Sequence, residues 1–126
     1  MEVVVTGLGI VASIGNNVNE CLQSFELHQS GIQPLRNLNS KYAGIMPVGE
    51  VKLSNEKLQN LTGLTESYLS RSILLSYTAV IEAIKDINIS SLGELNVGFI
   101  SGTTVGGMDI TENSLQEYFL NEEYGN

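Results

Sequence analysis

The stretch that decides the fold is VVVTGLGIVASIGN, residues 3–16 of the chain. Three β-branched valines lead into a loop in which Gly7, Gly9 and Gly15 recur, and a helix-like segment follows. An apolar run without alternation is typical of a strand buried on both faces, as in a parallel sheet. Glu2 to Thr6 is therefore predicted to be a buried strand that opens an α/β domain.

A second apolar run predicts a second buried strand. Leu95 to Ile100 is bounded by glycine and leads into the glycine loop, Gly102–Gly107. Met108 to Leu120 can then form a helix, with Asp109 and Glu112 near its positive amino end, where carboxylates are favourable.

The region between these strands is predicted to hold three helices. The first runs from about Val18 to His28 and is capped by Asn16 or Asn17. A short helix, Asn55 to Leu61, is capped by Ser54 and ends near Gly63, and the longest helix runs from Thr65 to about Ile87. Gln33 to Tyr42 reads as irregular, Ile45 to Leu53 as a strand or an extended arm in which Pro47 favours a sheet edge, and Asn88 to Glu94 as a polar turn.

The longest helix is apolar around most of its circumference. Its apolar residues are Tyr68, Leu69, Ile73, Leu74, Leu75, Tyr77, Ala79, Val80, Ile81, Ala83 and Ile84. Such a helix belongs inside a protein, between layers of structure. Either it lies between two sheets of a larger fold, or one of its faces meets a partner. A parallel sheet of two strands is rarely complete, so we expect these residues to be a piece of a longer chain.

Composition restricts the class of protein. The chain has 126 residues, 42% hydrophobic and 16% charged, which predicts one globular domain and argues against disorder. The net charge is -8 with only six Lys and Arg residues, which argues against nucleic acid or an anionic membrane as partner.

Further sequence features indicate a cytoplasmic protein without a metal site. The single cysteine, Cys21, excludes an internal disulfide and a multi-cysteine metal site. There is no signal-peptide pattern, and the apolar runs are too short to span a membrane.

The residues Gly7-Leu8-Gly9-Ile10-Val11-Ala12 match the G-x-G-x-x-G/A pattern of dinucleotide-binding proteins. Two details argue against that interpretation. Ser13, Gly15, Asn16 and Asn17 delay the helix that would receive the pyrophosphate. No second strand ending in an acidic residue follows at the expected distance.

No other group of residues forms a complete active site. The glycine loop could cradle an anion, or could be a turn that lets the backbone approach a neighbour, and it has no lysine for a P-loop. Cys21 lies mid-helix among apolar residues and lacks an adjacent base, since His28 is roughly 10 Å further along that helix. Cys21 is therefore interpreted as a buried structural residue and His28 as a solvated one.

Several segments, in order along the chain, resemble the β-ketoacyl-acyl-carrier-protein synthases, the condensing enzymes of fatty-acid and polyketide synthesis. Residues 3–16 resemble the family's opening strand and turn. Residues 27–32, LHQSGI, resemble a G-x-S-G-I segment without its first glycine, and Arg71 resembles a basic residue that follows an aspartate in the family, here Ser70. Residues 97–107, VGFISGTTVGG, are similar to the family's second strand and glycine loop.

The resemblance implies a thiolase-like fold, an αβαβα sandwich in which central helices lie between two sheets. It implies that residues 1–126 are part of the amino-terminal half of such a domain. The family's catalytic cysteine and two histidines lie beyond the glycine loop, so the resemblance assigns no catalytic residue to this chain.

The resemblance also implies a modest set of site residues and partners. Thr104 and Val105 resemble positions in the wall or gate of the acyl pocket. The implied partners are acyl-carrier protein, malonyl and acyl thioesters, and a second copy of the chain in a homodimer. No cofactor or metal is implied.

Three alternatives remain open at this point. A catalytically silent partner subunit, such as a chain-length factor, keeps the same scaffold without the cysteine. An NAD(P)-dependent oxidoreductase would use the glycine pattern at residues 7–12. A free-standing interaction module would fold cooperatively on its own.

Overall fold

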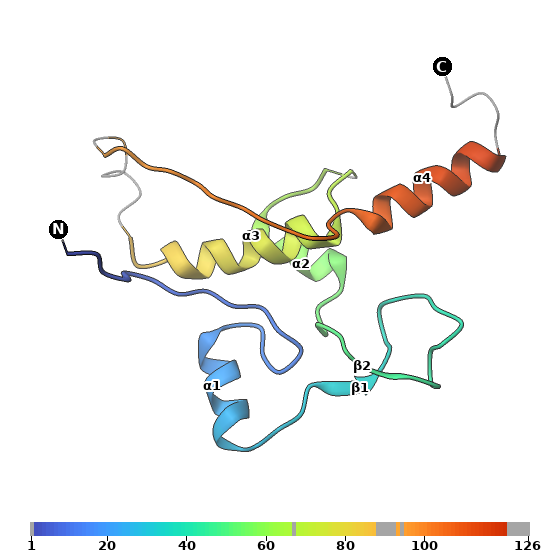
Figure 1. The fold of residues 1–126 in the computed structure, drawn as a ribbon, viewed down its shortest axis with the longest axis horizontal. Helices are drawn as coiled ribbons and strands as arrows, with labels where there is room; N and C mark the ends of the chain where they lie inside the picture. Colours follow the sequence, from blue (N-terminus) through green and yellow to red (C-terminus); the bar gives the residue numbers. More distant parts are fainter. Residues whose placement is uncertain (1, 67, 88–92, 94, 121–126) are drawn as a thin grey trace.

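The computed structural model describes residues 2–66, 68–87, 93 and 95–120. It combines helices with a small sheet, as expected for part of an α/β protein (Figure 1). The elements are α1 (Val18–Glu26), β1 (Ile32–Pro34), β2 (Pro47–Gly49), α2 (Asn55–Thr62), α3 (Arg71–Ile84) and α4 (Met108–Leu120).

The sheet is an antiparallel pair rather than the predicted parallel one. Strands β1 and β2 pair with Gln33 opposite Val48. Of the strand or extended arm predicted over Ile45 to Leu53, only Pro47–Gly49 is a strand, β2, and Ile45 lies in a turn. Strand β1 falls at the start of a segment that was predicted to be irregular. Each strand has only three residues, too few for an alternating pattern to be visible in the sequence.

Helix α1 begins where the sequence predicts. The Asn17 side chain accepts a hydrogen bond from the backbone N–H of Glu20 at 2.9 Å, and the Glu20 carboxylate accepts the N–H of Asn16 at 2.8 Å. These two hydrogen bonds stabilise the first turn of the helix. The helix ends at Glu26, before His28, whose φ of 52° is incompatible with a continuing helix.

Helix α2 confirms its predicted caps. The Ser54 hydroxyl accepts a hydrogen bond from the N–H of Lys57 at 3.3 Å. At the other end Gly63 has a φ of 71°, the left-handed conformation that commonly ends a helix.

Helix α3 is shorter than predicted at both ends. It begins at Arg71 rather than Thr65, because the Ser70 hydroxyl accepts from the N–H of Ile73 and caps the helix there. It ends at Ile84, three residues before the predicted end at Ile87. The apolar pattern runs through both boundaries, so it did not mark them.

The two segments predicted as buried strands are not strands in this structure. Among the described residues, neither 2–6 nor 95–100 is paired in a sheet. Both segments are extended, and α3 lies between them (Figure 1). A strand requires a neighbouring strand for its hydrogen bonds, and here a helix occupies the adjacent position.

Directly after the first of these segments, at Gly7 and Gly9, the chain packs backbone to backbone against α3. A Cβ atom on Gly7 would collide with the carbonyl oxygen of Ala83, and one on Gly9 with the carbonyl oxygen of Ala79. The two glycines therefore allow a close approach that no other residue permits. Dinucleotide binding needs a helix that begins within the glycine motif. Here the glycines face α3 instead, and α1 begins only at Val18.

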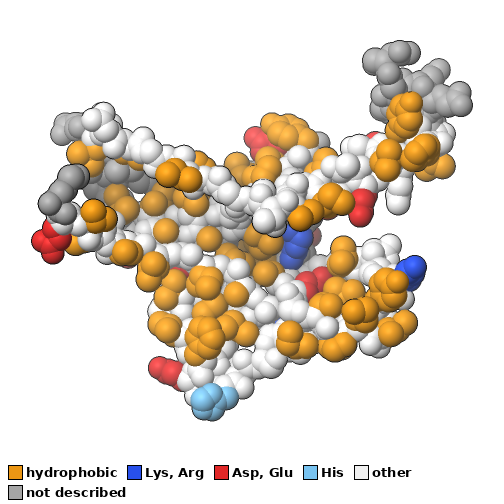
Figure 2. Space-filling model, viewed as in Figure 1, with side chains coloured by type: hydrophobic (Ala, Val, Ile, Leu, Met, Phe, Trp, Pro, Cys, Tyr) orange, Lys and Arg blue, Asp and Glu red, His pale blue; other side chains and the backbone are white. Residues whose placement is uncertain are grey.

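The fully buried core is small. Leu58 of α2 and Leu74 of α3 are the large side chains with essentially no exposed surface among the described residues. Many apolar side chains remain exposed, among them Val3 at 89% and Ile100 at 97%. Figure 2 shows hydrophobic side chains spread over the viewed face, including the surface of α1 and the loop after β1.

Candidate functional site

The glycine loop, Gly102–Gly107, brings the chain to the amino end of α3 and then into α4 (Figure 1). Gly107 has a φ of 82°, a conformation that side chains rarely adopt. Its carbonyl oxygen accepts the N–H of Thr111 at 3.0 Å, which begins α4 directly after the turn.

One hydrogen bond and one close approach bring this loop against α3. The Asp109 carboxylate accepts the backbone N–H of Arg71 at 2.9 Å. Gly106 faces the hydroxyl of Ser72, and a Cβ atom on Gly106 would lie 3.3 Å from that oxygen. The loop is therefore attached at the first turn of α3, where backbone N–H groups lack partners within the helix.

A cavity of about 360 Å³ separates α3 from the chain that leads into the loop. It is lined on one side by Ser72, Ser76 and Tyr77, and on the other by Phe99, Gly102 and Thr103. The predicted pocket residues, Thr104 and Val105, follow directly after this lining. Both are exposed, Val105 at 67%, so the described chain leaves them open to solvent.

The side chain of Arg71 ties a second segment to the same end of α3. Its guanidinium donates to the carbonyl oxygens of Val51 and Leu53, each at 2.8 Å, and to Oδ1 of Asn55 at 2.7 Å. The sequence resemblance singled out Arg71, but its role here is to fix the chain between β2 and α2.

Glu50 is a polar anchor that the sequence analysis missed. Its carboxylate accepts the backbone N–H groups of Arg36, Asn37 and Leu38 at 2.8 to 3.1 Å. Desolvation alone would raise the pKa of Glu50. The three N–H donors and the positive charge of Arg71 outweigh it and lower the pKa below the ordinary glutamate value.

Glu50 and Arg71 border a cavity of about 530 Å³ whose other walls are mainly apolar. Leu38, Met46, Val48 and Leu75 are among its lining residues. A single glutamate after a strand of three residues is not distinctive, so no pattern in the sequence marks this place.

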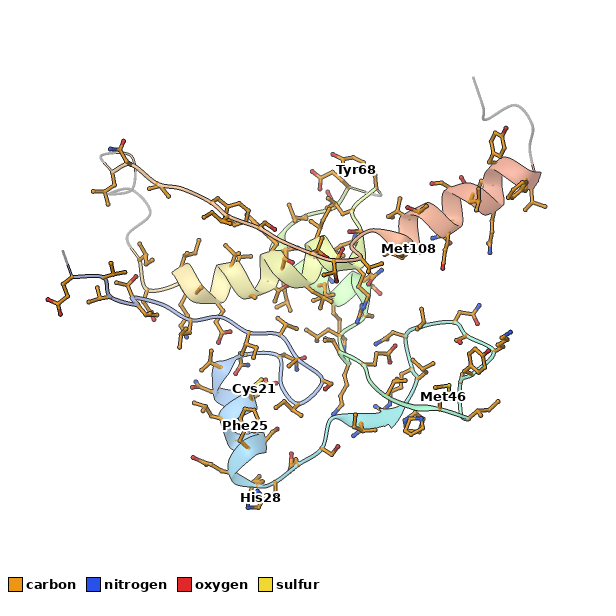
Figure 3. The ribbon with its side chains drawn as sticks, in the orientation of Figure 1. Cys21, Phe25, His28, Met46, Tyr68 and Met108 are labelled. Atoms are coloured by element: carbon orange, nitrogen blue, oxygen red, sulfur yellow. The ribbon has the colours of Figure 1, made fainter. Side chains whose placement is uncertain are left out.

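Cys21 is where the sequence analysis put it, on the buried side of α1 (Figure 3). Only 3% of the residue is exposed, and its thiol lies 3.5 Å from the carbonyl oxygen of Gly15. Burial raises the pKa of the thiol, and the nearby charges of Glu20 and Glu82 raise it further. A nucleophilic cysteine needs the opposite shift. The predicted burial of Cys21 is confirmed, and its purely structural role stays a prediction.

His28 lies beyond the end of α1, away from Cys21 along the helix (Figure 3). It is exposed, in agreement with the prediction of a solvated residue. The structure does not bring the two side chains together as a nucleophile and a base.

The part of the chain that the structure describes contains no group of three or more His, Cys, Asp or Glu residues suited to a metal ion. Within the same residues, no helix has the length and apolar character needed to cross a bilayer.

Comparison with known proteins gives these features a context. A 3-oxoacyl-acyl-carrier-protein synthase 1 from Buchnera aphidicola subsp. Acyrthosiphon pisum is 34% identical over 117 residues, which cover 90% of this chain and 28% of the relative. The chain is similar to the 3-oxoacyl-acyl-carrier-protein synthases. The expected resemblance to the β-ketoacyl synthases, the same enzymes under another name, is thereby confirmed.

Other 3-oxoacyl-acyl-carrier-protein synthases give the same result. Synthase 1 of Escherichia coli K12 is 34% identical over 110 residues, covering 82% of this chain and 26% of the relative. A putative mitochondrial synthase of Schizosaccharomyces pombe is 30% identical over 125 residues, covering 86% of this chain and 28% of the relative.

The chain thus spans about a quarter of the length of these synthases, 26% to 28%. No protein-family profile matches it. No solved structure matches it either.

Proposed function

We propose that residues 1–126 are the amino-terminal part of a ketosynthase domain with the thiolase-like αβαβα fold. The similarity to synthases at 34% identity over 90% of the chain carries the proposal. Helix α3, which lies between two extended apolar segments, supports it, because that fold places central helices between two sheets.

The whole protein would catalyse a decarboxylative Claisen condensation in fatty-acid or polyketide synthesis. A cysteine thiolate takes the acyl group from its carrier as a thioester. Loss of CO₂ from malonyl-carrier protein leaves a carbanion that attacks the acyl carbonyl carbon, and the cysteine departs as thiolate. Two histidines promote the decarboxylation and stabilise the developing oxyanion.

In this proposal the catalytic residues lie outside residues 1–126, and this part is inactive by itself. The buried Cys21, whose thiol pKa is raised, is unsuited to forming an acyl-enzyme. The chain's contribution is the scaffold and part of the acyl pocket, with Thr104 and Val105 in its wall or gate. Their position directly after the lining of the 360 Å³ cavity supports this role.

The partners follow from the same proposal. Acyl-carrier protein and malonyl and acyl thioesters are the substrates, and the protein forms a homodimer in the cytoplasm. The reaction requires no cofactor.

The test uses the full-length protein that contains this chain. Given acyl-carrier protein charged with an acyl group and malonyl-carrier protein, it should release CO₂ and form a 3-oxoacyl product. Mass spectrometry should find the acyl-enzyme on a cysteine outside residues 1–126, and C21S should retain the activity.

Three results would contradict the proposal. Acylation of Cys21 would show that the catalytic cysteine lies within residues 1–126, contrary to the proposal. A full-length protein that lacks activity but sets product length for an active partner would be a chain-length factor. Tight, stoichiometric binding of NAD(H) or NADP(H) would identify an oxidoreductase.

A further inference from the structure

The glycine loop and α4 have few attachments to the rest of the described chain. No residue of α4 is buried, and α4 projects away from the other elements (Figure 1). The position of the loop therefore depends strongly on the contacts at its carboxyl end. One of these contacts is the hydrogen bond from the Arg71 N–H to the Asp109 carboxylate, at 2.9 Å, which joins the residue two positions after the loop to the first turn of α3.

The electrostatics of this contact are favourable. The Asp109 carboxylate lies at the amino end of α3, where the helix dipole is positive. Ser70 caps the same end by accepting from Ile73, and Asp109 satisfies a different N–H, that of Arg71. The two acceptors do not compete, so Asp109 acts as a second cap supplied by a distant element.

Arg71 joins the glycine loop and the segment after β2 at the same end of α3. Its backbone N–H holds the glycine loop through Asp109, while its side chain holds the segment after β2 through Val51 and Leu53. Arg71 and Asp109 also line a common cavity of about 350 Å³. A shift of Asp109 would therefore move the loop relative to both α3 and that segment.

We propose that Asp109 is a positioning residue that fixes the glycine loop on the first turn of α3 and thereby sets the acyl-chain selectivity of the loop. The inference rests on the proposed function, because selectivity is expressed only in the condensing reaction. Asp109 acts through the loop and does not itself contact the acyl chain.

The experiment compares three variants of the full-length protein. D109N keeps an oxygen acceptor, D109L removes it at similar size, and E112Q is a matched control on an exposed residue one turn further along α4. For each protein, kcat and KM are measured with acyl-carrier protein that bears either a short or a long saturated acyl group.

We expect D109L to change the ratio of kcat/KM between the two substrates by about five- to tenfold, mainly through KM, the size expected for the net loss of one typical intramolecular hydrogen bond. D109N should remain within about threefold of wild type and E112Q within about twofold. A wild-type ratio in D109L, or an equal defect in D109N and D109L, would overturn the inference.

A second measurement does not depend on activity. Hydrogen exchange at the Arg71 amide and in the glycine loop should accelerate in D109L and stay close to wild type in D109N and E112Q. Unchanged exchange in D109L overturns the inference whether or not the protein condenses acyl groups.

If D109L does not fold, D109S takes its place, with an effect expected between those of D109N and D109L. An inactive wild type with accelerated exchange in the variant contradicts only the proposed function.

Discussion

The Glu82 carboxylate of α3 accepts the backbone N–H of Val18, the first residue of α1, at 2.8 Å. Its other oxygen accepts the N–H of Ile10 at 2.9 Å. One side chain therefore holds both the opening segment and the start of α1 against α3. The two glycines at positions 7 and 9 bring the backbone close enough for this arrangement.

Replacing Glu82 should destabilise the protein. E82A removes a charged acceptor from two backbone donors, and the expected loss is about 1–3 kcal/mol in the free energy of unfolding. Denaturant unfolding monitored by circular dichroism measures it. E117Q, on an exposed position of α4, is the control and should change stability by less than about 0.5 kcal/mol. Equal stability of E82A and wild type would show that these bonds contribute nothing net.

The glycines that face α3 should not tolerate a side chain. G9A places a methyl group on the carbonyl oxygen of Ala79, and G7A places one on that of Ala83. Each should cost about 1–3 kcal/mol, because the backbones must move apart. Thermal unfolding provides the measurement, with G98A as control, since nothing lies within 4 Å of a Cβ atom there. A G98A protein as unstable as G9A would contradict the steric explanation.

Glu50 should make the stability of the protein depend on pH in the acidic range. Its pKa is lowered in the folded protein, so its contribution is fully present above the unfolded pKa of about 4.3. That contribution is lost as the pH falls from there through the lowered folded value, because protonation removes the negative charge that the N–H groups of Arg36, Asn37 and Leu38 stabilise. E50Q should therefore be less stable than wild type at neutral pH, and the difference should shrink in acid. Unfolding curves at several pH values test this, and a difference that is constant with pH would refute it.

Cys21 should be unreactive in the folded protein. Its burial and raised pKa leave little accessible thiolate at neutral pH. An alkylating reagent followed by mass spectrometry should modify Cys21 slowly under native conditions and completely in denaturant. Rapid native labelling would mean that α1 opens readily.

The elements predicted well were those with local signals. Ser54 and Gly63 delimit α2 because a hydroxyl cap and a left-handed glycine act within one turn. The range of α4 also matches the prediction, from the residue after Gly107 to Leu120. The start of α3 was missed because Thr65 and Ser70 are both suitable caps, and only the hydrogen bond to Ile73 selects Ser70.

The contacts around the glycine loop could not be predicted, because they join residues far apart in the sequence. Asp109 looked favourable for its own helix, whereas its carboxylate accepts from the first residue of another. Glu50 and Glu82 gave no signal, since each depends on backbone groups that only the folded chain brings together. The predicted strands failed for a related reason: apolar β-branched residues favour an extended chain, but pairing requires a neighbour.

The extended segments on either side of α3 have a practical consequence for handling the chain by itself. Within the described residues, the backbone groups of 3–9 and 95–100 form no backbone–backbone hydrogen bonds, and Val3, Val5, Phe99 and Ile100 are at least three-quarters exposed. Exposed apolar segments with unpaired backbone groups readily form intermolecular β-sheet with other molecules. A preparation of residues 1–126 should accordingly aggregate as its concentration rises, and V4K should shift the onset of aggregation to higher concentration.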